Sequence, residues 1–251
     1  SSNTVPSTSI NTYNTKILRT GIDSLYLSYQ GALTEESSIK LTELKKLAQS
    51  NEPSSVSLAQ MELNEHVFEV SDRGRNVYAF VLKDNWYQIS VAKLGAIRVP
   101  LVYSQLSSEL LTKQGADFAV LELSEIVKYL GTVTEEPAIS RVDLCVDFVT
   151  DYPLSEIKDS DWVTRADVIS SHSSRRKFSG CSIGSGGSIS ARLYNKTVEM
   201  KRVPRPYLEQ IHRECGWDGT QQVWRLEFQF MRAALRELDL KYFSNLNDSL
   251  S

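Results

Sequence analysis

The chain has 251 residues, of which 41% are hydrophobic and 24% charged, and this composition excludes a disordered or fibrous protein. It can bury the core of one large or two small globular domains. A formal net charge of -3 and a pI near 5.7 exclude a protein that coats nucleic acid nonspecifically, because such binding neutralises phosphates with Lys and Arg. A local nucleic-acid site remains compatible with this charge.

The sequence predicts neither a membrane span nor a signal peptide. No apolar run approaches the roughly 20 residues that a membrane span requires, and the first residues lack a basic and hydrophobic start. We therefore expect a cytoplasmic protein without a membrane partner. Cys145, Cys181 and Cys215 fit neither a disulfide framework nor a zinc motif, and we expect three free thiols.

Residues 1–16 are rich in Ser, Thr and Asn and are predicted to form a disordered tail. Residues 17–251 follow as one region, with 17–135 and 136–251 as candidate similar α+β halves. The first half begins with a predicted strand and a helix, and continues as an antiparallel meander and two further helices. The predicted strands are 22–29, 66–70, 77–83, 86–93 and 97–105, and the predicted helices are 34–48, 107–113 and 116–130.

The second half contains a predicted hairpin of strands 178–183 and 189–196 around Gly186 and Gly187, since paired glycines tolerate the positive φ of tight turns. A turn centred on these glycines places Tyr194 opposite Ser179, with Lys177 and Arg175 on the same face as Tyr194. A shift of one residue would reverse the face. The other predicted elements are strands at 141–148 and 223–230, helices at 205–215 and 231–238, and a weak helix at 154–157.

Three of these strands alternate apolar and polar residues, so that one face of each carries acids or bases. One interpretation is that these side chains form structural ion pairs on the wet side of an antiparallel sheet. The other is that Asp143 and Glu227, with or without Asp147, bind a hard divalent cation through oxygen. The polar sets are Arg141, Asp143 and Asp147 in the first strand, Arg192, Tyr194 and Lys196 in the second, and Arg225 and Glu227 in the third.

Tyr194 is a candidate nucleophile. A phenol has an unperturbed pKa near 10 and attacks only if something stabilises the phenolate, and Arg192 and Lys196 flank it on one face. A facing metal would polarise a phosphodiester and neutralise the developing charge. The alternative is an ordinary tyrosine on a sheet face, and the basic stretch around it is alternatively a solvated surface.

The motifs Arg-x-Asp-x-x-x-Asp at 141–147, Arg-Leu-Tyr-Asn-Lys at 192–196 with Glu199 after it, and Arg-Leu-Glu at 225–227 together resemble a known family. The chain resembles the Rep_trans replication initiation factors of plasmids and phages, which include rolling-circle initiators and are related to the HUH endonucleases. Segments 21–25 and 102–111 extend the resemblance, which covers about residues 20 to 232.

The resemblance implies an α+β fold, with an antiparallel sheet as a platform and helices packed on one face. It implies a DNA nicking and closing enzyme, whose tyrosine attacks a phosphodiester and forms a 5′-phosphotyrosyl link. By this resemblance Tyr194 is the nucleophile, and Lys196 and Arg192 hold the scissile phosphate or lower the pKa of the tyrosine. Asp143 and Glu227 are then metal ligands, and Asp147 is a third. The expected DNA contacts are Arg175, Arg176, Lys177, Arg141 and Arg225, of which the last two alternatively orient the carboxylates.

The chain departs from the HUH group in its histidines. His66, His172 and His212 stand alone, so no His-x-His pair exists, and carboxylates in its place favour Mg²⁺ or Mn²⁺ over Zn²⁺. His172 lies near the basic stretch, as a candidate ligand or as a solvated histidine. The expected partners are origin DNA, either single-stranded or in a cruciform or supercoiled form, a host helicase and a second copy of the chain.

Two other functions remain open. One is a non-catalytic, sequence-specific DNA-binding regulator of a plasmid or phage, which would bind DNA without cleaving it. The other is a protein-interaction domain whose strand faces carry only structural ion pairs, and which would not bind DNA even at low salt.

Overall fold

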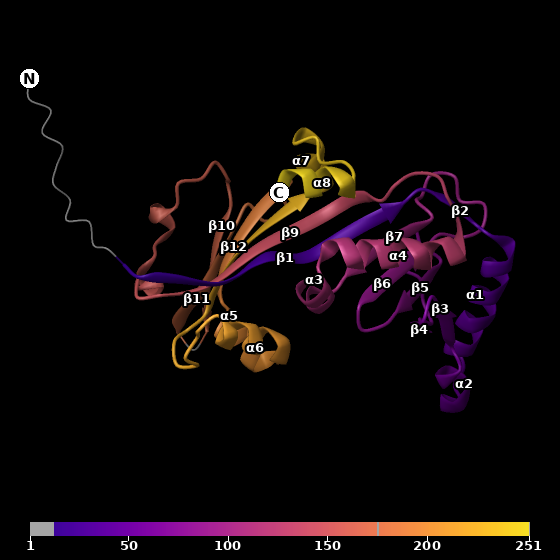
Figure 1. Ribbon diagram of the computed structural model, residues 1–251, viewed down its shortest axis with the longest axis horizontal. Helices are drawn as coiled ribbons and strands as arrows, with labels where there is room; N and C mark the ends of the chain where they lie inside the picture. The colour runs from indigo at the N-terminus through magenta and orange to yellow at the C-terminus, as the bar shows by residue number, and fades with distance from the viewer. Residues whose placement is uncertain (1–12, 175, 251) are drawn as a thin grey trace, which may run out of the picture. The chain divides into compact units, whose positions relative to one another are not determined.

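The computed structural model describes residues 13–174 and 176–250, and the chain forms two compact units (Figure 1). Unit 1 comprises the segment ending at Thr20 together with Val146–Ser185 and Ala191–Glu227. Unit 2 comprises Gly21–Cys145, Gly186–Ser190 and the segment that begins at Phe228. The fold is a mixed α+β fold with a large antiparallel sheet, which confirms the predicted class. The predicted similarity of the halves 17–135 and 136–251 stays a prediction.

Most of the predicted tail, 1–16, lies outside the described residues. The first strand begins at Thr15, two residues before residue 17, where the ordered region was predicted to start. The Thr15 hydroxyl lies 2.9 Å from the Thr150 hydroxyl, and the backbone N–H of Asn14 donates to Asp151 Oδ1 at 2.8 Å. Pairing with a distant strand therefore orders a polar segment that has little to bury.

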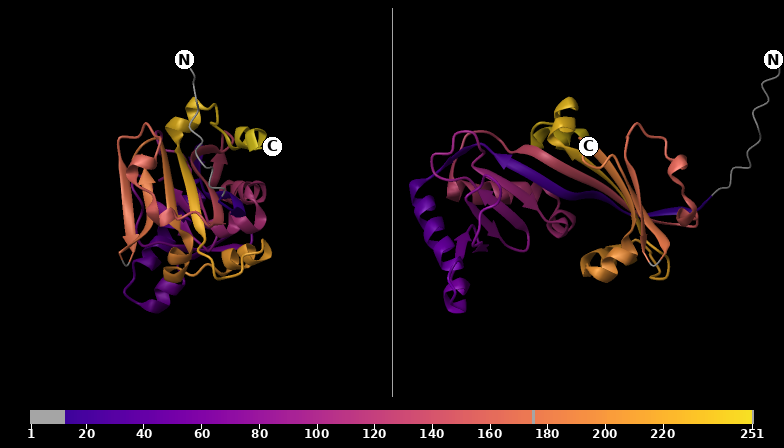
Figure 2. Two further views of the ribbon diagram at one scale, coloured as in Figure 1. Left: turned by 90° about the vertical axis from the view of Figure 1, so that its left-hand side faces the viewer. Right: turned by 180° about the vertical axis from the view of Figure 1, so that it is seen from behind.

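Unit 1 is built on strands that are hydrogen-bonded in the order β10-β11-β12-β13-β9-β1. Two helices, α5 (Lys196–Arg202) and α6 (Pro206–Glu214), connect β12 to β13. The connection from β9 to β10 contains two short 3-10 turns and loops out beside the sheet (Figures 1 and 2). The strands are β10 (Ile169–Ser174), β11 (Lys177–Ile183), β12 (Ile189–Asn195), β13 (Trp224–Met231), β9 (Ala138–Thr150) and β1 (Thr15–Tyr29), and the turns are Leu154–Glu156 and Asp159–Asp161.

The two faces of the unit 1 sheet differ as the alternation predicts. Leu193 and Trp224 lie in a buried apolar cluster with Cys181, against Leu154 of the β9–β10 connection. Along each strand, the residues next to these point to the opposite face, which carries the polar side chains described below. This polar face has an apolar cluster of its own, formed by Leu18, Val149, Trp217 and Val223.

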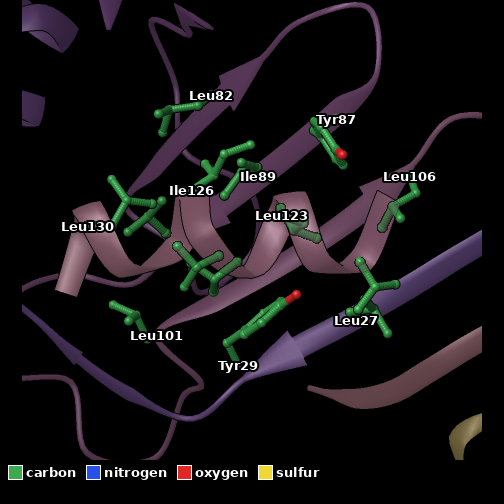
Figure 3. Packing of buried hydrophobic residues seen from close by; sticks show 14 of the residues in the cluster. Leu27, Tyr29, Leu82, Tyr87, Ile89, Leu101, Leu106, Leu123, Ile126 and Leu130 are labelled. Carbon is green, nitrogen blue, oxygen red and sulfur yellow. The ribbon is translucent and has the colours of Figure 1, made fainter. Parts of the chain in front are cut away.

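Unit 2 contains the predicted meander, in the order β9-β1-β7-β6-β5-β4-β3. Helix α4 (Ala116–Leu130) packs on one face of these strands, because its apolar stripe includes Leu123 and Leu130 (Figure 3). The Tyr29 hydroxyl lies 3.1 Å from that of Ser124, which fixes α4 over β1. The remaining strands are β3 (Gln60–Leu63), β4 (His66–Val70), β5 (Phe80–Lys83), β6 (Tyr87–Val91) and β7 (Val102–Leu106), with a separate pair, β2 (Gly31–Leu33) and β8 (Gly131–Val133).

The other helices of the described chain are short, apart from the predicted α1. Helix α1 begins after Thr34, whose hydroxyl accepts the N–H of Ser37 as expected of an N-cap. All three cysteines are free, as predicted. No helix among residues 13–174 and 176–250 is long and apolar enough to cross a membrane. The helices are α1 (Glu35–Ala48), α2 (Pro53–Ser57), α3 (Ser108–Gln114), α7 (Arg232–Glu237) and α8 (Phe243–Leu250).

His66 links the meander of unit 2 to α4 through two acids. Its Nδ1 lies 2.7 Å from Asp84 and its Nε2 lies 3.2 Å from Glu122, which also accepts the Tyr87 hydroxyl at 2.7 Å. Burial alone lowers the pKa of His66, but the hydrogen bonds and charges of Asp84 and Glu122 outweigh burial and raise it. Both ring nitrogens face acceptors, which favours the imidazolium form.

The ion pairs of His66 make the stability of unit 2 depend on pH. Because the pKa is raised in the folded state, the stabilisation is fully present below the unfolded value of about 6.5 and is lost as pH rises through the folded value. We expect His66→Gln to lower the free energy of unfolding by about 2 kcal/mol at pH 6 and by less at pH 9. Urea titrations at both pH values measure this, and equal losses would refute the cationic form.

Candidate active site

Tyr194 and Glu227 form the centre of the polar face of unit 1. Tyr194 stands on β12 and is half-buried, and its hydroxyl donates to Glu227 Oε2 at 3.2 Å. Glu227 stands on the neighbouring strand β13 and is 1% exposed. The other oxygen of this carboxylate accepts a hydrogen bond from the Arg192 guanidinium. One buried acid thus holds the phenol and a cation side by side.

Two cations flank the Tyr194 ring. The Lys196 ammonium lies 5.6 Å from the ring centroid, and the Arg192 guanidinium lies 6.0 Å from it. The side chain of Lys196 is 5% exposed and pairs with Glu199 at 2.5 Å, whereas that of Arg192 is 48% exposed. Arg192 is therefore open to a ligand, while Lys196 supplies a fixed charge from below the surface.

The chain changes from strand to helix directly after Tyr194. Asn195 caps α5, since its side chain accepts the N–H of Val198 at 3.0 Å. The N–H of Lys196 donates to Val223 O at 2.8 Å, and the Asn195 amide donates to Gln222 at 2.9 Å. The predicted strand through Lys196 is thus one residue too long. The cap and the contacts with the start of β13 fix Tyr194 at the end of its strand.

The predicted register of the hairpin is wrong by one residue. Tyr194 lies opposite Gly180, not opposite Ser179. Ser179 is an extra residue in the pairing of β10 with β11, which resumes at Phe178 and Lys177 with shifted alternation. Phe178 packs against the apolar cluster of the other face, so Lys177 shares the face of Tyr194 as predicted. The loop between β11 and β12 runs from 184 to 188, and its positive φ values are at Gly184 and Gly186 and not at Gly187. A Cβ at Gly180 would lie 2.3 Å from Leu193 O and 2.9 Å from Tyr194 Cβ. Only glycine fits beside Tyr194 at this position.

Asp147 belongs to the same face but is closed off in a buried network. It accepts Arg225 Nε at 2.5 Å and Arg225 Nη2 at 2.7 Å, and His212 Nε2 lies 2.9 Å away, with all three side chains fully buried. Burial alone raises the pKa of Asp147, but the hydrogen bonds from Arg225 and His212 outweigh burial and hold it well below its usual range. Since the carboxylate only accepts, His212 Nε2 is the donor.

Sequence reasoning missed His212. It lies on α6, where Leu208 and His212 occupy one buried face at a spacing of four residues. That spacing indicates that His212 is buried, but it does not reveal which acid the histidine contacts. Only the packing of α6 against β9 brings it to Asp147.

Asp143 and Arg141 belong to unit 2 and bind each other. Arg141 Nε donates to Asp143 Oδ1 at 2.8 Å, with a second hydrogen bond from the same guanidinium, and Arg141 also lies 4.9 Å above the Tyr26 ring. Asp147 and Glu227 are in unit 1. The structure therefore assembles Tyr194, Arg192, Lys196 and Glu227 in one place, and holds Asp143 in an ion pair of its own.

The predicted acids do not fit a divalent cation in this arrangement. Both oxygens of Asp143 and Asp147 and one oxygen of Glu227 accept from a guanidinium, which supplies the positive charge that a metal would bring. Within residues 13–174 and 176–250, no three His, Cys, Asp or Glu side chains are grouped so that they could hold a metal ion. The interpretation as ion pairs describes these contacts better.

The predicted DNA contacts fall into different environments. Arg176 and Lys177 are exposed at the turn between β10 and β11, and Arg175 lies outside the described residues. Arg202 of α5 donates to Ser174 at 3.3 Å, which brings the basic helix to this turn. Arg225 is fully buried on Asp147, which suits its alternative role of orienting a carboxylate.

No model of a known protein family matches this sequence, and a search of curated proteins finds no match either. The geometry of the site and the sequence motifs are therefore the grounds for a function.

Removing one member of a buried ion pair is costly, because the partner keeps its charge without compensation. We expect Asp147→Ala to lower the free energy of unfolding by about 3–5 kcal/mol at pH 7. Since the pKa of Asp147 is depressed, this stabilisation is present above the unfolded value of about 3.9 and is lost as pH falls through the folded value.

Asp143→Ala is the matched control, because its partner Arg141 is 25% exposed and can turn to water. Its expected loss is about 1 kcal/mol, near the range of an exposed pair. Urea denaturation of both variants measures the difference. Equal losses would show that burial of the Arg225 pair does not matter.

Proposed function

We propose that this protein nicks and rejoins DNA through attack of Tyr194 on a phosphodiester, as a rolling-circle replication initiator does. The observation that carries the proposal is the hydrogen bond of Tyr194 to the buried Glu227, with Arg192 and Lys196 on either side of the ring. The resemblance of the three strand motifs to Rep_trans initiators supports it. The antiparallel sheet below the site is compatible with the HUH-like platform of that class.

Glu227 is the group placed to take the phenol proton. A phenol with an unperturbed pKa near 10 does not transfer its proton to a carboxylate near 4.3 in advance, so the transfer accompanies formation of the O–P bond. The charge of Lys196 favours the developing phenolate. Tyr194 thereby becomes nucleophilic only when a phosphate is in position.

Arg192 is the group placed to meet the phosphate. Its guanidinium is half-exposed and already lies beside the tyrosine ring. Planar guanidinium groups bind phosphate oxygens through two parallel hydrogen bonds, and they stabilise the charge that develops on those oxygens during attack. The same side chain thus orients Glu227 before substrate binds and contacts the phosphate afterwards.

The reaction balances without a further reactant. The tyrosine oxygen bonds to phosphorus, the bond from phosphorus to the 3′ oxygen breaks, and the proton held by Glu227 or a water proton neutralises that oxygen. The 3′-hydroxyl reverses these steps when the strand is rejoined. Mg²⁺ or Mn²⁺, which the resemblance implies, has no part in these steps, because the acids as they lie do not fit it.

A second candidate function is a non-catalytic DNA-binding regulator. The observation that favours it is that each predicted acid is already neutralised by an arginine. In both functions the proposed partner is origin DNA, and a host helicase and a second copy of the chain are further proposed partners of the nicking enzyme.

Covalent capture tests the proposed reaction. The protein is incubated with a labelled random-sequence library of single-stranded DNA, with Mg²⁺ or Mn²⁺ and, separately, with chelator. Adducts are resolved under denaturing conditions and mapped by mass spectrometry. We expect an adduct on Tyr194, its loss in Tyr194→Phe, and a rate that falls by about 10²–10⁴-fold in Glu227→Gln, because the proton acceptor is removed.

Tyr152→Phe is the control, because this tyrosine is also in unit 1 and exposed, but its ring packs edge-on against Tyr13 instead of beside Glu227. It should form the adduct at the parent rate. Undiminished capture by Tyr194→Phe would remove Tyr194 from the role. Binding of DNA with no adduct under any of these conditions would favour the regulator.

A further inference from the structure

A row of residues crosses three neighbouring strands at Tyr194. In the register of the sheet, His172 of β10 lies opposite Gly180 of β11, and Gly180 lies opposite Tyr194 of β12. Residues directly opposite each other share one face, and strands are about 4.8 Å apart. His172 and Tyr194 therefore stand on the same face, roughly 10 Å apart at their Cα atoms.

Gly180 leaves a gap in this row of side chains. A Cβ there would collide with the backbone of Leu193 and with Tyr194 itself, so this buried position carries no side chain between Tyr194 and His172. Polar residues surround this gap on the same face.

Three hydrogen-bonding groups lie on a diagonal, from His172 in this row to Ser182 and Arg192 in the next. His172 is exposed, and its Nε2 lies 3.0 Å from the Ser182 hydroxyl. Ser182 lies opposite Arg192, whose guanidinium is half-exposed. An imidazole, a hydroxyl and a guanidinium thus follow one another across β10, β11 and β12.

The charge of this face is complementary to a polyanion. The sequences of β10, β11 and β12 contain neither Asp nor Glu. At one end of these strands Arg202 donates to Ser174, beside the exposed Arg176 and Lys177. The acids Glu227, Glu199 and Asp147 of this face are each paired with a cation.

We propose that His172, Ser182 and Arg192 form a second phosphate-binding position, which holds the phosphate next to the one that Tyr194 attacks. Single-stranded DNA then crosses β12, β11 and β10 along these three side chains. This proposal rests on the proposed function for its substrate, and it assigns a role to His172 and Ser182 that the reaction itself does not require.

Noncovalent binding tests this position without catalysis. In a Tyr194→Phe background, the affinity for a fluorescein-labelled, short single-stranded oligonucleotide is measured by anisotropy at low salt, where phosphate contacts are strongest. The double variant His172→Gln, Ser182→Ala should bind about 10-fold more weakly, since two hydrogen bonds to phosphate are lost. His172→Arg with Ser182 intact should keep the parent affinity, because a guanidinium also donates hydrogen bonds to phosphate.

Ser171→Ala is the matched control. Ser171 lies opposite Cys181, on the other face of the same strand, and is exposed. It should leave the affinity unchanged. An unchanged affinity in the double variant, an equal loss in Ser171→Ala, or no DNA binding by the parent would overturn the proposal.

The capture experiment separates this proposal from the proposed function. With Tyr194 intact, the double variant should need more DNA for half-maximal capture but should reach the parent rate at saturation. If neither the parent nor the double variant forms an adduct while the double variant still loses affinity, the nicking function fails and the binding position stands. If capture proceeds with an unchanged DNA requirement, the binding position fails and the nicking function stands.

Discussion

The buried carboxylate of Glu227 is the constraint on which the site depends. A charge with 1% exposure is stable only if its oxygens are paired, and the neighbouring strand provides both partners, Arg192 and Tyr194. These contacts require one alignment of β12 against β13. Gly180 then fixes the alignment of β11, because a side chain there would collide with Tyr194. The pairing of one acid thereby sets the register of three strands and the position of the phenol.

The buried carboxylate of Asp147 must also be paired, and its pairing gives it a structural role. Asp147 is fully enclosed by Arg225 and His212, so this network can stabilise β9, β13 and α6 but cannot meet a ligand. Glu227 differs because its arginine is half-exposed and its other partner is a phenol. The alternation of the strands places Asp147 and Glu227 alike, yet they have different roles. Only Glu227 is suited to a reaction with phosphate.

The sequence predicts the parts of the fold that depend on periodicity. Alternation identifies β9, β13 and the meander, and the apolar stripe identifies α4. It does not reveal β10, whose residues Ile169–Ser174 are almost all polar and which is ordered by pairing at a sheet edge. The register at Tyr194 was missed because it depends on the backbone of the loop between β11 and β12. The positive φ values of this loop are at Gly184 and Gly186, and not at the adjacent pair Gly186 and Gly187. Alternation placed Arg192, Tyr194 and Glu227 on polar faces correctly, but the closure of each acid by an arginine depends on side-chain packing between strands.

A double-mutant cycle between Tyr194 and Glu227 tests the central claim most directly. The free energies of unfolding of Tyr194→Phe, Glu227→Gln and the double variant are compared with the parent at neutral pH. If the hydroxyl donates to this carboxylate, the two changes are coupled by about 1 kcal/mol, the size expected of a hydrogen bond to a charged group after reorganisation. Additive losses, with no coupling, would contradict the arrangement from which the chemistry was derived.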